Sequence, residues 1–184
     1  MRRYWFPKRY ADTVAKLRVP AGFLMVAAFA WLAMPTRISL MWGAPLSVAG
    51  LLVRAWAAGH LAKNTTLAAA GPYRYLRNPL YLGTVMVAAG LAVSAREPIL
   101  GLLFAAMFIL VYLPVIEREE QHLRTLFPDY AHYAERVPML LPKLSGHRQG
   151  GRFSQRLYMK NQEYNALFGY LAGLAFLVWK ARSG

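Results

Sequence analysis

The sequence contains no cysteine and few acidic residues. Its 184 residues include eight Asp or Glu, against 22 Lys or Arg. Without cysteine the chain can form no disulfide framework, no thiolate metal site and no cysteine nucleophile. The four histidines form no close-spaced pair of the HExxH kind, and His122 and His132 are ten residues apart. We therefore interpret the histidines as surface or interfacial side chains rather than metal ligands.

Apolar residues, in contrast, are abundant. The chain is 57% hydrophobic and 16% charged, whereas soluble domains average about 45–50% apolar and about 25% charged residues. A soluble helical core with this many apolar runs would have little polar surface left to cover them. The sequence predicts an all-α integral membrane protein with about five transmembrane helices. The runs are residues 19–34, a second run over 38–59 (with Pro45 inside) or 45–61, then 80–95, 99–116 and 164–179.

Several of these runs are shorter than a perpendicular membrane span, which needs about 20 residues. Amphipathic neighbours must extend them, or the bilayer must thin locally. The length suits one domain, residues 1–184. Within it we distinguish a basic interfacial N-terminus (1–18), a core (19–143), and a basic loop followed by an additional transmembrane helix (144–184).

The net charge of +14 is compatible with binding to nucleic acid or with an anionic membrane surface. If the N-terminus is cytoplasmic and the runs alternate in direction, the cytoplasmic pieces are 1–18, 60–79 and 117–163. They contain six, three and eight Lys or Arg, which is 17 of the 22. This asymmetry follows the positive-inside rule. We therefore predict contact with membrane lipids, a cytoplasmic N-terminus and no nucleic-acid partner.

Residues 117–137 are amphipathic, with Leu and Tyr at helical spacing. They predict a helix lying along the membrane interface, broken at Pro128. Residues 138–152 are rich in Pro and Gly and predict a loop.

Two polar features stand out beside the apolar runs. Arg54 lies within the second run, where a charge usually faces the protein interior or a watery cavity. It could anchor an anionic group, pair with Glu119 or Glu120, or extend to the nearby membrane surface. Glu117 and Glu120 share one helix face while Glu119 points elsewhere. These carboxylates could accept hydrogen bonds, supply a general base, or form a solvated face.

Pro114 precedes the acidic cluster. It should loosen the helix and free backbone carbonyls just where the carboxylates begin.

The stretch GPYRYLRNPLYLG, residues 71–83, separates the second and third apolar runs. Asn78 precedes Pro79 and so leaves the helical region, which predicts a helix start there. Backbone N–H groups at a helix start can bind anions, and three tyrosines supply flat faces. Composition alone indicates only a turn at the membrane surface.

This stretch resembles the GxYxxxRHPxYxG loop of the membrane-embedded methyltransferases. That family includes isoprenylcysteine carboxyl methyltransferase, phosphatidylethanolamine methyltransferase and many bacterial relatives. IEREEQHLRTLFPDYAHYAERVPMLLPK similarly resembles the family's EExxLxxxFGxxYxxYxxxVPxxxP motif. Together the matches cover about residues 48–143. Two motifs in the right order, on either side of one helical hairpin, form a specific signal.

The resemblance implies S-adenosylmethionine as methyl donor, bound in a pocket on the cytoplasmic side, with S-adenosylhomocysteine as product. Glu119 would lie near the reacting centre as catalytic residue, and Arg54 and Glu119 would bind substrate. The cofactor-binding positions implied by the family are Thr65, Thr66, Leu67, Ala68, Tyr73, Asn78, Pro79, Leu80, Tyr81 and Glu120.

The implied reaction is methylation of a lipidic or amphipathic molecule, with carboxyl O-methylation of an isoprenylcysteine-like substrate as the first hypothesis. The alternatives are N-methylation of a phospholipid amine, or a non-catalytic lipid-binding protein of the same fold. The implied location is a bacterial inner membrane. Three departures from the family pattern bear on this choice: Asn78 replaces the motif His, Pro128 replaces a Gly, and Val115 stands where the carboxyl methyltransferases carry an Arg.

Overall fold

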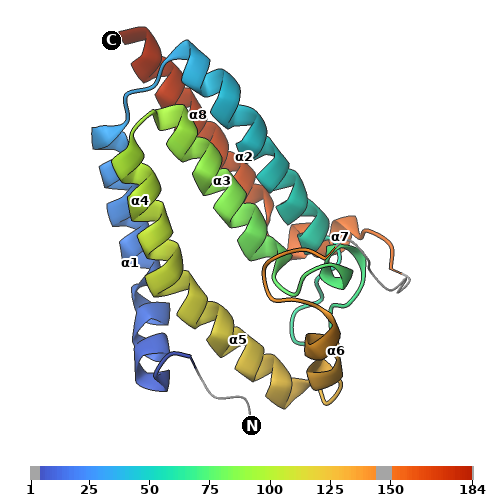
Figure 1. Ribbon diagram of the computed structural model, residues 1–184. Coiled ribbons are helices and arrows are strands. Elements are labelled where there is room, and N and C mark those ends of the chain that lie inside the picture. Colours follow the sequence, from blue (N-terminus) through green and yellow to red (C-terminus); the bar gives the residue numbers. More distant parts are fainter. Residues whose placement is uncertain (1–4, 144–150, 184) are drawn as a thin grey trace.

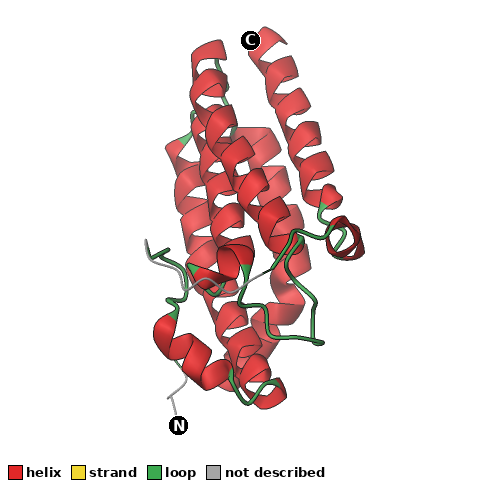
Figure 2. Ribbon diagram, turned by 90° about the vertical axis from the view of Figure 1, so that its right-hand side faces the viewer, coloured by secondary structure: helices red, strands yellow, loops and turns green. Residues whose placement is uncertain are grey.

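The computed structural model describes residues 5–143 and 151–183, and these residues contain helices and loops but no strand (Figure 2). The elements are α1 (Lys8–Leu32), α2 (Arg37–Ala58), the 3₁₀ turn η1 (Gly71–Arg74), α3 (Pro79–Ala95), α4 (Pro98–Met107), the π-helical turn η2 (Phe108–Tyr112), α5 (Leu113–Leu126), α6 (Tyr130–Arg136), α7 (Gln155–Lys160) and α8 (Tyr164–Ser183).

Three helices are long and apolar enough to cross a membrane, which confirms a helical membrane protein. They are α1, α2 and the continuous helix Pro98–Leu126, and α3 is a shorter apolar helix. Each predicted apolar run falls on a helix, while the count of five spans stays a prediction. The second run follows the longer alternative, because α2 contains Pro45. α1 begins at Lys8, so it extends well into the segment expected at the interface.

Helices α2 and α3 pack closely, side by side, because glycines face each other across their contact. A Cβ at Gly50 would lie 2.7 Å from the Gly83 carbonyl oxygen, and one at Gly90 would lie 2.5 Å from that of Gly43. Small residues of this kind let helix backbones approach within a membrane. The Ser39 hydroxyl adds a hydrogen bond to the Ser94 carbonyl, at 2.8 Å. The α2–α3 hairpin is therefore a rigid frame behind the loop that joins the two helices.

The proline in the fourth apolar run changes the helix as predicted. Pro114 has no N–H to donate to the carbonyl of Leu110, four residues earlier. The π-helical turn η2 directly precedes this proline. The Tyr10 hydroxyl of α1 instead donates to the Leu110 carbonyl, at 2.6 Å. The freed carbonyl therefore ties α1 to the helix that carries the acidic cluster.

The prediction of one interfacial helix over residues 117–137 is wrong in part. No helix-breaking residue separates the acidic cluster from the apolar run, so residues 117–126 continue the long helix as α5. The chain leaves the helix at Phe127 and restarts as α6 at Tyr130, so the predicted break at Pro128 is confirmed.

The polar segments gather at one end of the bundle (Figure 1). The 59–78 loop, the end of α5, α6 and α7 lie there, and the described N-terminal residues point the same way. The C-terminal end of α8 lies at the opposite end, near a buried cluster that includes Phe29, Ala95, Leu100 and Leu177. Of the predicted 138–152 loop, residues 144–150 lie outside the described residues.

Candidate functional site

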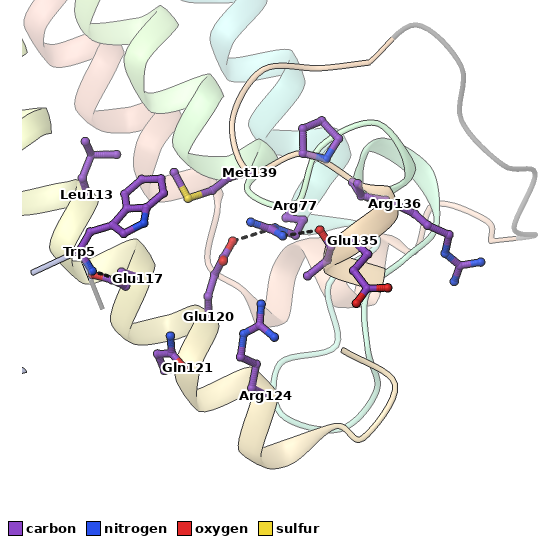
Figure 3. Close-up of a pocket in the computed structure, with 13 residues that line it drawn as sticks. Trp5, Arg77, Leu113, Glu117, Glu120, Gln121, Arg124, Glu135, Arg136 and Met139 are labelled. Atoms are coloured by element: carbon purple, nitrogen blue, oxygen red, sulfur yellow. Dashed lines mark hydrogen bonds and ion pairs between the residues drawn. The ribbon is translucent and has the colours of Figure 1, made fainter. Parts of the chain in front are cut away.

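The two sequence motifs meet at a buried ion pair. Arg77, from the 71–83 stretch, places its Nε 2.9 Å from Oε1 of Glu120 on α5, and both side chains are less than a tenth exposed. The Asn78 amide donates to the same carboxylate oxygen at 3.0 Å. Nη1 of Arg77 donates to the Ala134 carbonyl of α6 at 2.8 Å. Figure 3 shows the guanidinium between Glu120 and α6.

Backbone hydrogen bonds join the same two segments. The Arg77 N–H donates to the Pro138 carbonyl at 2.9 Å, the Asn78 N–H to Met139 at 3.2 Å, and the Lys143 N–H to Tyr75 at 3.1 Å. Two segments that are far apart in the sequence therefore pack against each other.

The acidic cluster divides between two cavities, as the helical spacing predicts. Glu117 and Glu120 line a smaller cavity of about 290 Å³ (Figure 3). In this cavity the Glu117 carboxylate accepts the backbone N–H groups of Trp5 and Phe6, at 2.7 and 3.0 Å. Glu119 points away and lines a larger cavity of about 570 Å³.

The larger cavity collects most of the predicted site residues. Its volume is within the range of about 300–1,000 Å³ that is typical of small-molecule sites. Eight of the twelve predicted positions line it: Arg54, Thr66, Leu67, Ala68, Tyr73, Leu80, Tyr81 and Glu119.

The other four predicted positions do not line this cavity. The Thr65 hydroxyl donates to the nearby Ala62 carbonyl on an exposed turn. Pro79 is fully buried at the first turn of α3. Asn78 and Glu120 belong to the ion-pair network described above. The contacts of Asn78 and Glu120 join the two sequence motifs.

Charged and aromatic groups surround Glu119. Tyr81 lines the same cavity as Glu119. Arg18 of α1 and Lys63 of the 59–70 loop also line the cavity and act on Glu119 electrostatically. With Arg54 and Arg77, the cavity thus combines one carboxylate, four cations and several tyrosine rings.

Tyr73 forms the inner wall of the cavity. Burial raises the pKa of its hydroxyl, and the negative charges of Glu163 and Glu119 raise it further. Among the described residues this buried hydroxyl has no hydrogen-bond partner. The Tyr133 hydroxyl holds the residue in place by donating to the Tyr73 carbonyl at 2.7 Å. Tyr73 therefore offers a neutral donor to whatever enters the cavity.

Of the alternatives left open for Arg54, pairing with Glu119 or Glu120 is wrong. Its Nε pairs with Glu163, which lies between α7 and α8. Its Nη1 donates to the hydroxyl of Thr84 and, at 3.4 Å, to the Leu80 carbonyl. Sequence reasoning missed Glu163 because it lies 109 residues from Arg54 in a segment with no recognisable motif.

An apolar groove adjoins the polar cavity. It has a volume of about 560 Å³ and is lined by side chains of α1, α3, α4 and η2. Thr84 and Tyr112 line both spaces. The rings of Tyr81 and Tyr112 meet edge to face at this junction, with centroids 6.0 Å apart. Sequence reasoning missed Thr84 and Tyr112, which carry no motif signal.

Within the described residues, no group of three His, Asp or Glu side chains is placed to hold a metal ion.

Comparisons with known proteins identify the family. The chain is similar to the cobalt-zinc-cadmium resistance protein CzcN of Cupriavidus metallidurans, with 36% identity over 110 residues, 59% of this chain and 50% of that protein. It is also similar to the nickel-cobalt-cadmium resistance protein NccN of Alcaligenes xylosoxydans xylosoxydans, with 35% identity over 94 residues, 50% of this chain and 44% of that protein. The chain thus spans about half the length of these curated relatives.

No solved structure matches the chain significantly. The model of the phospholipid methyltransferase family matches residues 18–130, which is more than half of the chain and includes the residues that form the larger cavity on α2, α3 and α5. The chain belongs to the phospholipid methyltransferase family.

Proposed function

We propose that this protein is an S-adenosylmethionine-dependent methyltransferase that methylates a carboxylate on a lipidic, isoprenylcysteine-like molecule at the membrane. The observation that carries the proposal is the continuity of two spaces. A polar cavity holding eight of the predicted site residues shares Thr84 and Tyr112 with an apolar groove among the membrane-spanning helices. A water-soluble donor and an amphiphilic acceptor can therefore meet at one place.

The cavity residues fit the chemistry of the cofactor. S-adenosylmethionine carries a sulfonium cation, an amino group, a carboxylate and an apolar base. Tyrosine faces attract a cation, and Arg18 and Lys63 suit a carboxylate. Leu67 and Ala68 provide apolar wall for the base. The buried Tyr73 hydroxyl, which has no partner among the described residues, is a free donor inside this wall.

When bound, the cofactor supplies an electrophilic methyl group. The protein's own residues must align the acceptor about 3–3.5 Å from that methyl and exclude water. An ionised carboxylate acceptor needs no general base. For an amine or hydroxyl acceptor, Glu119 is placed to take the proton.

The apolar groove suits the acceptor's hydrocarbon chain, with its head at Thr84 and Tyr112. Arg54 contacts Thr84 and lines the polar cavity, so its guanidinium suits an anionic head at this junction. This arrangement favours a carboxylate.

N-methylation of a phospholipid amine is the second candidate. Two observations favour it: Val115 stands where the carboxyl methyltransferases carry an Arg, and Glu119 would attract an ammonium group. The two reactions yield products of different chemical stability, since an ester releases methanol in base whereas an N-methyl group does not.

The proposed function is tested with purified protein, methyl-labelled S-adenosylmethionine, and two acceptors: a prenylated cysteine with a free carboxylate, and phosphatidylethanolamine. We expect label in a base-labile product of the first acceptor. Glu119→Gln should reduce transfer to the amine acceptor, which must lose a proton, more than transfer to the carboxylate, which needs no base. Glu135→Gln should reduce neither, because Glu135 is about three-quarters exposed on α6. Base-stable label in the phospholipid would establish the second candidate instead. Absence of transfer to either acceptor by well-folded protein, with no binding of the cofactor, would favour a non-catalytic lipid-binding protein.

A further inference from the structure

Residues 151–163, which we call the strap, lie outside the segment matched by the family model. They cross the C-terminal end of α2, where the last helical carbonyls need donors. The Asn161 amide donates to the carbonyls of Ala58 and Leu61, both at 2.9 Å. The Ser154 N–H donates to the Gly59 carbonyl at 2.9 Å. The strap thus supplies hydrogen-bond donors to carbonyl groups at and just after the end of α2.

Close packing fixes the strap against the loop that follows α2. The Phe153 ring lies against His60, with centroids 6.3 Å apart. A Cβ at Gly59 would overlap the Phe153 ring, and a Cβ at Gly151 would lie 2.5 Å from that of Ala70. The strap backbone therefore passes close to the 59–70 loop, with no room for a side chain at Gly59 or Gly151.

The strap ends with a buried carboxylate. Gln162 has a positive φ of 54°, which turns the chain between α7 and α8. Glu163 follows, is only 8% exposed, and pairs with Nε of Arg54. With its Nε engaged by Glu163, Arg54 directs Nη1 at Thr84, where the polar cavity and the apolar groove meet.

We propose that Glu163 is a positioning residue for the acceptor site: it fixes the Arg54 guanidinium at the junction, so that the strap completes a site otherwise built from the family core. This inference rests on the proposed function. Glu163 does not itself line the cavity and acts through Arg54, which does. Glu163 is the one acidic residue of the strap, and among the described residues it is the carboxylate that forms an ion pair with Arg54.

The test compares Glu163→Gln, Glu163→Asp and Arg54→Lys in the full-length protein, with Glu135→Gln as control. For Glu163→Gln we expect KM for the carboxylate acceptor to rise by roughly 10-fold, the change that corresponds to a loss of about 1.4 kcal/mol of acceptor binding. The dissociation constant of S-adenosylhomocysteine, measured by calorimetry, should change much less, because the cofactor contacts lie elsewhere. Glu163→Asp keeps the negative charge, so its KM should lie between those of the wild type and Glu163→Gln.

Combining Glu163→Gln with Arg54→Lys should cost little more than either substitution alone, because both act on one interaction. A purely structural role would instead lower Tm and weaken cofactor and acceptor binding together, and this result would refute the inference. Unchanged KM in folded Glu163→Gln would also refute it. If the wild type neither binds cofactor nor transfers methyl groups, the proposed function itself fails, which is a different outcome from an active wild type with an equally active Glu163→Gln.

Discussion

The Arg77–Glu120 pair gives the sharpest stability prediction, because its two side chains are 4% and 8% exposed. Glu120→Gln removes the negative charge and leaves the Arg77 guanidinium buried beside a neutral group. Breaking a buried pair by removing one partner costs about 3–5 kcal/mol. In a chain of this size each kcal/mol shifts Tm by about 2–4 °C. We therefore expect Tm to fall by roughly 6–20 °C, a range that follows from these two figures.

The protein contains a matched control for this prediction. Asp12 and Arg118 form an ion pair of the same length, 2.9 Å, but their side chains are 43% and 55% exposed. Exposed pairs contribute about 0.2–1 kcal/mol, so Asp12→Asn should shift Tm by no more than about 4 °C. The measurement is thermal unfolding in detergent, followed by tryptophan fluorescence.

A double variant completes the comparison. Arg77→Met combined with Glu120→Leu replaces the pair with apolar groups, which often restores the stability lost by a single substitution. It should therefore melt above Glu120→Gln. Equal shifts for Glu120→Gln and Asp12→Asn would refute the reasoning, because the cost would then not depend on burial.

Three further predictions follow from other contacts. Gly50→Ala should destabilise the α2–α3 hairpin by about 1–3 kcal/mol through overpacking, whereas Gly169→Ala, with no atom within 4 Å of its Cβ, should not; equal Tm values would contradict the close helix packing. Tyr10→Phe should cost about 0.5–1.5 kcal/mol, because the Leu110 carbonyl loses its donor, and an unchanged Tm would show that the bond contributes nothing. Burial raises the pKa of Tyr133 above its usual value. The contribution of the neutral hydroxyl to stability is therefore fully present below the unfolded pKa of about 10 and is lost as pH rises from there through the folded pKa. The free energy of unfolding should fall as pH rises above about 10, with a shallower slope in Tyr133→Phe.

The helices could be predicted from sequence because their signals are local. Apolar runs bounded by Pro79, Pro98 and the α2 start at Arg37 mark three of the boundaries. The effect of Pro114 on the helix could also be predicted, because a proline has no N–H and so leaves the carbonyl four residues earlier without its helical donor. Its partner, Tyr10, could not be foreseen, because that contact depends on how α1 packs against η2.

In the candidate site, too, some features could be predicted from the sequence and others depended on tertiary packing. The two motifs carried enough information to place Glu119 and Tyr81 together. The separate directions of Glu119 and Glu120 also follow from helical spacing. The ion pairs did not follow from sequence, because any of the acidic residues could have met Arg54. Tertiary packing of the strap, outside both motifs, selected Glu163.

The central claim is that the larger cavity binds S-adenosylmethionine, and calorimetry on the purified protein tests it most directly. Both S-adenosylmethionine and S-adenosylhomocysteine should bind, and Tyr81→Ala should weaken binding because Tyr81 lines the cavity. Tyr164→Ala, at the start of α8 and outside the cavity lining, should bind as the wild type does. Failure of well-folded wild-type protein to bind either compound would contradict the claim.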